Sequence, residues 1–163
     1  MQVIDIFGDN RFDKHTKFRE ASRGIVINNN QILLSYEVNR NQWFIPGGGK
    51  ENGESNLECC IRELKEETGY LVSAENEYLI INEYYEEYLY LSHYYICDVV
   101  GVTEQNLTSR ELEAGLEPRW VDFKEALNIF AKHHDYAKSD EMKRGAYLRE
   151  YKALLAYLEI KMT

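Results

Sequence analysis

The sequence predicts an α+β domain, or an α/β/α layered domain, built on a mixed β-sheet. Short apolar runs bounded by turn residues predict strands, and three longer segments carry apolar residues at helical spacing. Strands and helices do not alternate regularly, which argues against an all-parallel sheet. A chain of 163 residues is the size of one domain, so we expect residues 1–163 to fold as a single unit.

The expected strands are short and follow one another closely. Asn28–Asn30 separates two apolar runs and predicts the turn of a β-hairpin. Pro46 and the glycines after it end a third run as a loop, and Glu86-Glu87 joins two longer strands. The predicted strands are, in chain order, Gly24–Ile27, Ile32–Leu34, Trp43–Ile45, Tyr78–Glu83, Leu89–Val100 and Arg119–Val121.

Three helices are expected, at about 56–68, after Asp122, and at about 140–161. Ser55 and Glu58 form a capping-box pattern before the first, as Asp122 and Glu125 do at the second. The last helix carries an apolar stripe, which either packs on the domain's own sheet or joins two copies, so the chain is expected to be a monomer or a homodimer. We favour packing within the chain. The stripe consists of Tyr147, Tyr151, Leu154, Leu155 and Leu158.

Composition excludes several classes of protein. The formal net charge of −9 disfavours binding to duplex nucleic acid, although a bound cation could still bring in a small phosphorylated ligand. No stretch is apolar enough to span a membrane, and no secretion signal is visible. The three cysteines form no disulfide framework, so we expect reduced thiols and a cytoplasmic location.

The chemistry of the chain is expected on the first helix. Glu63, Glu66 and Glu67 are spaced i, i+3 and i+4 and therefore share one face, where like charges repel. Two of them also occupy the last turn, where the helix dipole favours cations. The alternative is a solvated acidic face that Arg62 and Lys65 neutralise locally. The preceding Gly47–Gly49 lets the backbone approach a ligand, and together the two features favour a site for Mg²⁺.

A longer motif joins these residues, and it resembles the Nudix box of the Nudix hydrolase (MutT-like) family. Its last position is normally aliphatic but is Tyr70 here, which leaves the metal-binding positions intact. The resemblance covers about residues 23–130 and excludes the last helix. The motif reads Gly48-x5-Glu54-x7-Arg62-Glu63-Leu64-x-Glu66-Glu67-x-Gly69-Tyr70.

The resemblance implies an α/β/α sandwich with a mixed sheet, to which this chain adds a C-terminal helix. It also implies Mg²⁺-dependent hydrolysis of a nucleoside diphosphate linked to another moiety, with Mn²⁺ as a possible replacement. By position in the box, the metal ligands would be Glu63, Glu66, Glu67 and the Gly48 carbonyl. The residues with structural roles would be Glu54, Arg62 and Gly69.

The general base is left open by the resemblance, since family members use either a box glutamate or a carboxylate on a later loop. The candidates in the box are Glu66 and Glu67. Coordination to a metal makes a carboxylate less basic, which favours a separate group on the loop. Among Glu111, Glu113 and Glu117 we favour Glu113.

Two further residues are candidates for substrate binding. Arg23 opens the first core strand, where related enzymes often carry a phosphate-contacting arginine; an ordinary strand-edge arginine is the alternative. Tyr85 lies where family members sometimes carry residues that determine specificity, but packing in a tyrosine-rich region explains it equally well. His93 is expected to be a hydrogen-bonded core histidine.

Three functions remain open at this point. The leading one is a pyrophosphohydrolase acting on a small-molecule nucleotide, such as a nucleoside triphosphate, a nucleotide sugar or a dinucleoside polyphosphate. The second is a Nudix-like nucleotide-binding or regulatory domain without turnover, although such domains usually lose box glutamates that this chain keeps. The third is removal of a 5′ diphosphate from RNA, which the negative net charge disfavours.

Overall fold

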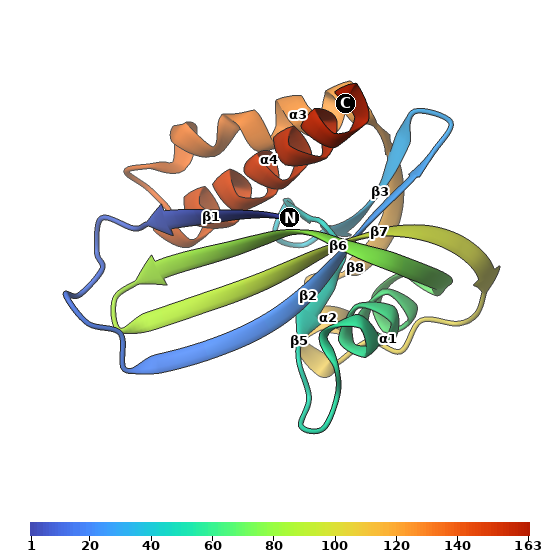
Figure 1. The fold of residues 1–163 in the computed structure, drawn as a ribbon, viewed down its shortest axis with the longest axis horizontal. Helices are drawn as coiled ribbons and strands as arrows, with labels where there is room; N and C mark the ends of the chain where they lie inside the picture. Colours follow the sequence, from blue (N-terminus) through green and yellow to red (C-terminus); the bar gives the residue numbers. More distant parts are fainter.

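A computed structural model describes residues 1–163 as an eight-stranded mixed sheet with helices on both faces (Figure 1). The strand order is β1-β6-β7-β2-β3-β4, with β5 paired to β2 and β8 paired to β3. β1 runs parallel to β6 and β2 parallel to β7, while the other pairs are antiparallel. The strands are β1 Gln2–Phe7, β2 Lys17–Asn28, β3 Gln31–Glu37, β4 Gln42–Phe44, β5 Gly47–Gly49, β6 Tyr70–Tyr85, β7 Tyr88–Val102 and β8 Leu116–Asp122.

The helices form the outer layers and confirm the predicted α/β/α arrangement. In Figure 1, α3 and α4 run side by side along one face of the sheet, and α1 and α2 lie against the other. No helix is both long and apolar enough to cross a membrane. The helices are α1 Asn56–Thr68, α2 Ser109–Ala114, α3 Phe123–Ala131 and α4 Glu141–Met162, with a 3-10 turn at Lys132–Tyr136.

Local signals predicted α1 and the β2–β3 hairpin well. Asn29 and Asn30 both have positive φ, at 51° and 63°, as a tight hairpin turn requires. Ser55 accepts the Glu58 N–H and Glu58 accepts the Ser55 N–H, so the capping box is complete. Gly69 ends α1 with φ of 75°, a conformation that a side chain would strain. At α3 the Asp122 side chain caps Lys124 and Glu125, which is one half of the expected box.

Several predicted boundaries were wrong. β1 was missed entirely, β2 begins at Lys17 rather than at Gly24, and β6 begins at Tyr70 rather than near Tyr78. The glycines expected to form a loop form β5 instead, because pairing with β2 satisfies their backbone groups. β1 and the first half of β2 are polar, and they form strands by pairing with distant segments: Gln2 pairs with Leu79 and Lys17 with Tyr88.

The core has two parts, one on each side of the sheet. The larger lies under α3 and α4 and includes Leu154 and Tyr147, so the stripe of α4 packs within the chain. Leu155, expected in the same stripe, is 39% exposed because it lies at the margin of the contact. The smaller part lies under α1 and contains Cys60, Leu64 and Cys97, among others.

A buried ion-pair network connects α4 to the strands that lead into β5. Glu150 is fully buried, accepts the Ile45 N–H at 2.5 Å and the Tyr94 hydroxyl at 2.6 Å, and pairs with Arg149 Nε at 3.0 Å. Arg149 also pairs with Glu83 at 3.3 Å. Buried charges require such partners, and here the pairing fixes the backbone just before the glycines.

Candidate active site

β5 brings a backbone strand directly against the acidic helix. Its residues pair with Ala21–Arg23 of β2, and successive residues face opposite sides of the sheet. Gly48 faces α1 so closely that a Cβ there would lie 2.5 Å from the Glu63 carboxyl carbon. A side chain at residue 48 would displace the Glu63 carboxylate, and the Gly48 carbonyl lies 3.4 Å from the Cys59 thiol, which donates to it.

Arg62 binds three of the glutamates on and beside the acidic face of α1. Its Nε and Nη2 bind both oxygens of Glu54, at 2.6 and 3.0 Å, and hydrogen bonding to this guanidinium lowers the pKa of Glu54 to about 2. Nη2 also donates to the Gly49 carbonyl at 3.0 Å. Nη1 contacts Glu63 and Glu66, each at 3.0 Å. One side chain therefore orients two predicted metal ligands and ties the helix to β5.

Glu67 is the most buried of the predicted ligands. Its Oε2 accepts the Ser35 hydroxyl at 3.2 Å and the Gly47 N–H at 3.1 Å. Burial, together with the negative charges of Glu63 and Glu111, raises the pKa of Glu67 to about 8. Burial likewise raises the pKa of Glu63. A divalent cation would relieve both effects, because it supplies the charge that these carboxylates lack.

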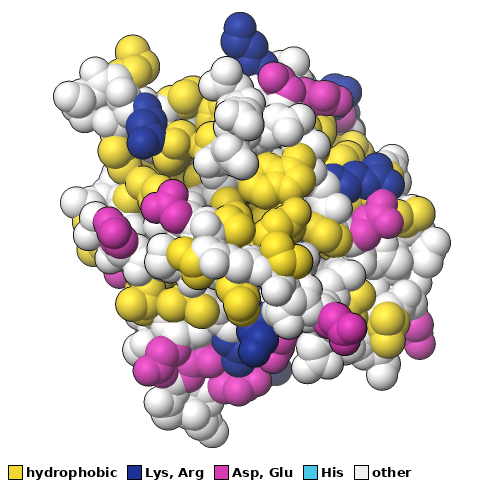
Figure 2. Space-filling view, turned by 90° about the vertical axis from the view of Figure 1, so that its right-hand side faces the viewer, with side chains coloured by type: hydrophobic (Ala, Val, Ile, Leu, Met, Phe, Trp, Pro, Cys, Tyr) yellow, Lys and Arg dark blue, Asp and Glu magenta, His cyan; other side chains and the backbone are white.

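The structure brings Glu63, Glu66 and Glu67 together with Gly48, although no three acidic, cysteine or histidine side chains converge closely enough to enclose a metal. Arg62 Nη1 contacts two of the carboxylates, and a shared cation would take over that contact. The donors are all hard oxygens, and the lack of a side chain at Gly48 lets the Glu63 carboxylate pack directly against the backbone, so the residues fit Mg²⁺ or Mn²⁺. Figure 2 shows acidic and basic side chains gathered at the lower end of one face, at the height of the β5–α1 loop in Figure 1.

The three candidate carboxylates on the loop, Glu111, Glu113 and Glu117, lie in different surroundings. Glu111 lies on α2, and its charge contributes to the raised pKa values of both Glu63 and Glu67. Glu113 is exposed, and it lies about 200° around the same short helix from Glu111. Glu117 pairs with Arg119 at 2.5 Å. The placement therefore favours Glu111 over the expected Glu113 as the carboxylate next to the box.

The two predicted substrate-binding residues lie in different surroundings. Arg23 is half-buried beside Gly47; Nη1 donates to the Ile45 carbonyl at 3.3 Å and Nε has no partner. The Tyr85 ring instead fills the space left by two glycines, since a Cβ at Gly8 or Gly145 would meet it at 2.3 or 2.2 Å. Its surroundings are those of a packing residue.

Sequence reasoning missed Ser35, Glu37 and Arg110. Ser35 and Glu37 alternate with Leu33 on β3, so they face the α1 side of the sheet, and Glu37 is only 2% exposed. Glu37 Oε2 pairs with Arg110 of α2 at 3.5 Å, while Oε1 has no partner. Polar residues at inward positions of an apolar strand were the available signal.

His93 is buried and hydrogen-bonded, as the sequence predicted. Its Nε2 pairs with Glu20 at 2.8 Å and its Nδ1 with Glu77. Neither contact involves the acidic face of α1.

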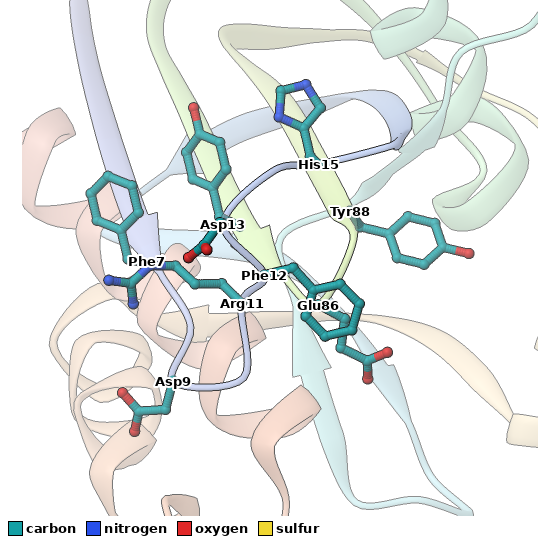
Figure 3. Close-up of a pocket in the computed structure, with 9 residues that line it drawn as sticks. Phe7, Asp9, Arg11, Phe12, Asp13, His15, Glu86 and Tyr88 are labelled. Carbon is teal, nitrogen blue, oxygen red and sulfur yellow. The ribbon is translucent and has the colours of Figure 1, made fainter.

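A hollow of about 550 Å³ lies at the other end of β2, away from the glutamates. The loop between β1 and β2 forms it with the β6–β7 turn, and Figure 3 shows Phe7 and Tyr88 on opposite sides of that loop. Three carboxylates line it, from Asp9, Asp13 and Glu86. Arg11 and His15 line it as well, but none of the box residues does, so it is separate from the acidic face of α1.

Comparison with known proteins agrees with this geometry. The family model of the NUDIX domain matches residues 18–142. An m7GpppN-mRNA hydrolase of Saccharomyces cerevisiae is 28% identical over 117 residues, which is 70% of this chain but only 12% of the yeast protein. A putative ADP-ribose pyrophosphatase of Bacillus subtilis is 48% identical over 48 residues, covering 29% of this chain and 23% of that protein.

The fold of this chain also resembles that of a solved NUDIX hydrolase. A solved NUDIX hydrolase from Nitrosomonas europaea shares 23% identity and superimposes with a TM-score of 0.58, covering 84% of this chain and 90% of that one. The family model spans most of the chain and includes β5, α1 and the acidic face. The chain therefore belongs to the NUDIX domain family.

Proposed function

We propose that the chain is a divalent-cation-dependent hydrolase that cleaves a phosphoanhydride bond of a nucleoside diphosphate linked to another moiety. One observation carries the proposal: Glu67 is buried and Glu63 half-buried against β5, both with raised pKa values, and Arg62 orients the face they share. Carboxylates with perturbed pKa values cluster at functional sites, and here one of them lies directly against the Gly48 backbone.

Glu63, Glu66, Glu67 and the Gly48 carbonyl would hold the cation, Mg²⁺ or Mn²⁺. A bound cation neutralises diphosphate oxygens and lowers the pKa of a water molecule. Substrate binding and the positioning of α1 would depend on side chains of the protein. Arg23 would bind a phosphate oxygen only by leaving its present position, where Nε is buried without a partner and the carboxylates of Glu83 and Glu150 are near. Arg62 holds the helix in register with β5.

A proton acceptor is also available in two places. Glu111 adjoins the box and would accept the proton of the attacking water, although one of its oxygens now accepts the Thr108 N–H at 2.9 Å. Glu66 or Glu67 would serve instead if the active complex leaves one of them unbound to metal. Glu113 stays a weaker candidate because its side chain is exposed.

The test is a hydrolysis screen over nucleoside triphosphates, nucleotide sugars, dinucleoside polyphosphates and 5′-triphosphorylated RNA, with Mg²⁺, with Mn²⁺ and with EDTA. Product masses identify the bond that breaks. We expect turnover that EDTA abolishes and that Glu67→Gln reduces by orders of magnitude, while Glu125→Gln, an exposed change on α3, leaves it intact. Full activity in EDTA would refute the cation's role.

The second candidate, nucleotide binding without turnover, is the outcome if every substrate binds and none is cleaved. RNA belongs in the screen because the yeast relative that matches 70% of this chain is an mRNA hydrolase. The Bacillus match reaches 48% identity over only 48 residues, so identity within the box does not select the substrate.

A further inference from the structure

The short helix α2 is bonded at its C-terminal end to the turn between β3 and β4. The last carbonyls of a helix have no partner inside the helix, and this turn supplies donors for them. The Val38 N–H donates to the Gly115 carbonyl at 3.2 Å, and the Asn39 N–H donates to the Ala114 carbonyl at 3.0 Å. The Asn39 side chain donates from Nδ2 to the Glu113 carbonyl at 2.7 Å. Two residues of the turn therefore hold three consecutive carbonyls at the end of α2.

An ion pair holds the first turn of α2 to the same strand. Arg110 Nη1 lies 3.5 Å from Oε2 of Glu37, which is the last residue of β3 and is only 2% exposed. The other oxygen of Glu37 has no partner, so Arg110 supplies the charge that compensates for the burial of this carboxylate. Both ends of α2 are thus attached to the end of β3.

The segment that leads into α2 is bonded to the end of α1. The Asn106 N–H donates to the Glu66 carbonyl at 2.8 Å, and Gln105 Nε2 donates to the Glu67 carbonyl at 2.6 Å. These backbone carbonyls belong to the last turn of the helix that carries the box glutamates. α2 is therefore held between the end of α1 and the end of β3, which sets its distance from the box.

The Glu111 carboxylate is fixed to α2 by the capping box of that helix. Glu111 Oε1 accepts the Thr108 N–H at 2.9 Å, and the Glu111 N–H donates to the Thr108 hydroxyl at 3.2 Å. Because of these two bonds, the carboxylate moves with the helix that carries it. The place of Glu111 relative to the box therefore depends on the contacts that hold α2.

We propose that Asn39 is a positioning residue for the hydrolysis, because it holds α2 so that the Glu111 carboxylate stays beside the box. The inference rests on the proposed function, in which Glu111 accepts the proton of the attacking water. The Asn39 side chain is exposed and bonds to the Glu113 carbonyl, so it acts only through α2. A displacement of about 1 Å of a catalytic group can cost about 10²-fold in rate. Two backbone bonds remain when this side chain is changed, so we expect part of that loss.

Asn39→Asp tests the proposal, because it keeps the size of the side chain and replaces the donor with an acceptor. Asn41→Asp is the matched control: it lies in the same turn, adds the same charge and keeps the oxygen that accepts the Tyr36 hydroxyl. We expect Asn39→Asp to lower kcat by about 10-fold. KM and the Mg²⁺ concentration for half-maximal activity should not change, because the proposed metal ligands lie on α1 and β5.

A double-mutant cycle separates positioning from a general loss of structure. In the Glu111→Gln background, Asn39→Asp should lower kcat no further, because the group that it positions is already gone. A residue that only supports the fold would lower kcat by the same factor in both backgrounds.

Amide hydrogen exchange in EDTA tests the contact without turnover. The Leu112 N–H, bonded to the Thr108 carbonyl at 2.9 Å, reports the opening of α2. We expect it to exchange faster in Asn39→Asp than in Asn41→Asp, while exchange in α1 stays the same. If the screen finds no substrate, the proposed function fails, and the exchange rates still decide whether Asn39 holds α2. Unchanged exchange, wild-type kcat in Asn39→Asp, or an undiminished loss of kcat in the Glu111→Gln background would overturn the proposal.

Discussion

Glu67 is protonated in the cation-free protein at neutral pH, because burial raises its pKa to about 8 from a usual value of 4.5. At a pH between these two pKa values, Glu67 keeps its proton in the folded chain and has lost it in the unfolded chain. The free energy of unfolding therefore falls as pH rises through this window, and the loss is complete above pH 8.

Replacing Glu67 with Gln should remove this dependence. In EDTA, the midpoint of thermal unfolding of wild type should fall between pH 5 and pH 8 by more than that of Glu67→Gln. The amide oxygen still accepts the Gly47 N–H, so the fold is kept. Thermal unfolding monitored by circular dichroism measures both proteins. Parallel pH profiles would show that Glu67 is already ionised in the folded state.

Glu111 and Glu113 provide a matched pair two residues apart on α2. We expect Glu111→Gln to lower kcat by about 10²–10⁴-fold, the usual effect of losing a general base. Glu113→Gln should keep wild-type kcat, because its exposed side chain lies on another side of the helix. Steady-state kinetics at saturating Mg²⁺ decides between them, and the reverse result would restore Glu113 as the base.

At the scale of elements, Arg62 is one of three α1 residues that bind β5, together with Cys59 and Glu67. Arg62→Ala removes the contacts to Glu54, Glu63, Glu66 and the Gly49 carbonyl together, and leaves their charges unpaired. We expect lower thermal stability and lower kcat at once. Arg62→Lys should recover part of the stability but less of the activity, because an ammonium cannot reproduce the bidentate contact with Glu54. Wild-type kinetics in Arg62→Lys would contradict this role.

α4 offers an internal comparison between neighbouring leucines. Leu154 is fully buried, whereas Leu155 is 39% exposed. Leu154→Ala should reduce the free energy of unfolding by about 2–5 kcal/mol, and Leu155→Ala by less than about 1 kcal/mol. Urea denaturation measures both, and gel filtration shows whether either change alters the oligomeric state. Similar losses for both would indicate that Leu155 is covered in solution by a second copy.

The elements also show what a single sequence can predict. α1 and the β2–β3 turn were predictable because a capping box, a terminal glycine and two asparagines act within a few residues. The cluster of box glutamates was predictable for the same reason, since helical spacing places them together. The contacts of Glu67 with Ser35, and of Glu150 with Ile45, join residues 32 and 105 positions apart. Strand register and helix packing decide such contacts, and neither is encoded locally.

For the whole molecule, cation binding and folding are linked. A cation that binds only the folded state raises its stability, and it competes with the proton on Glu67. The Mg²⁺-induced rise in the midpoint of thermal unfolding should therefore be larger at pH 8 than at pH 6. Differential scanning fluorimetry of wild type and Glu67→Gln tests this, and the variant should show a smaller rise at both pH values. A rise independent of pH in wild type would place the cation elsewhere.

The parallel pairings of β1 with β6 and of β2 with β7 have a consequence during synthesis. Gln2 pairs with Leu79, and Lys17 with Tyr88, so both early strands leave the ribosome long before their partners. Until then β2 can pair only with β3 and β5, and the edge that later pairs with β7 is unprotected. The sheet can close only after β7 has emerged, and contacts of such large sequence separation slow folding. The nascent chain therefore passes through a stage at which its first two strands are open to mispairing with other chains.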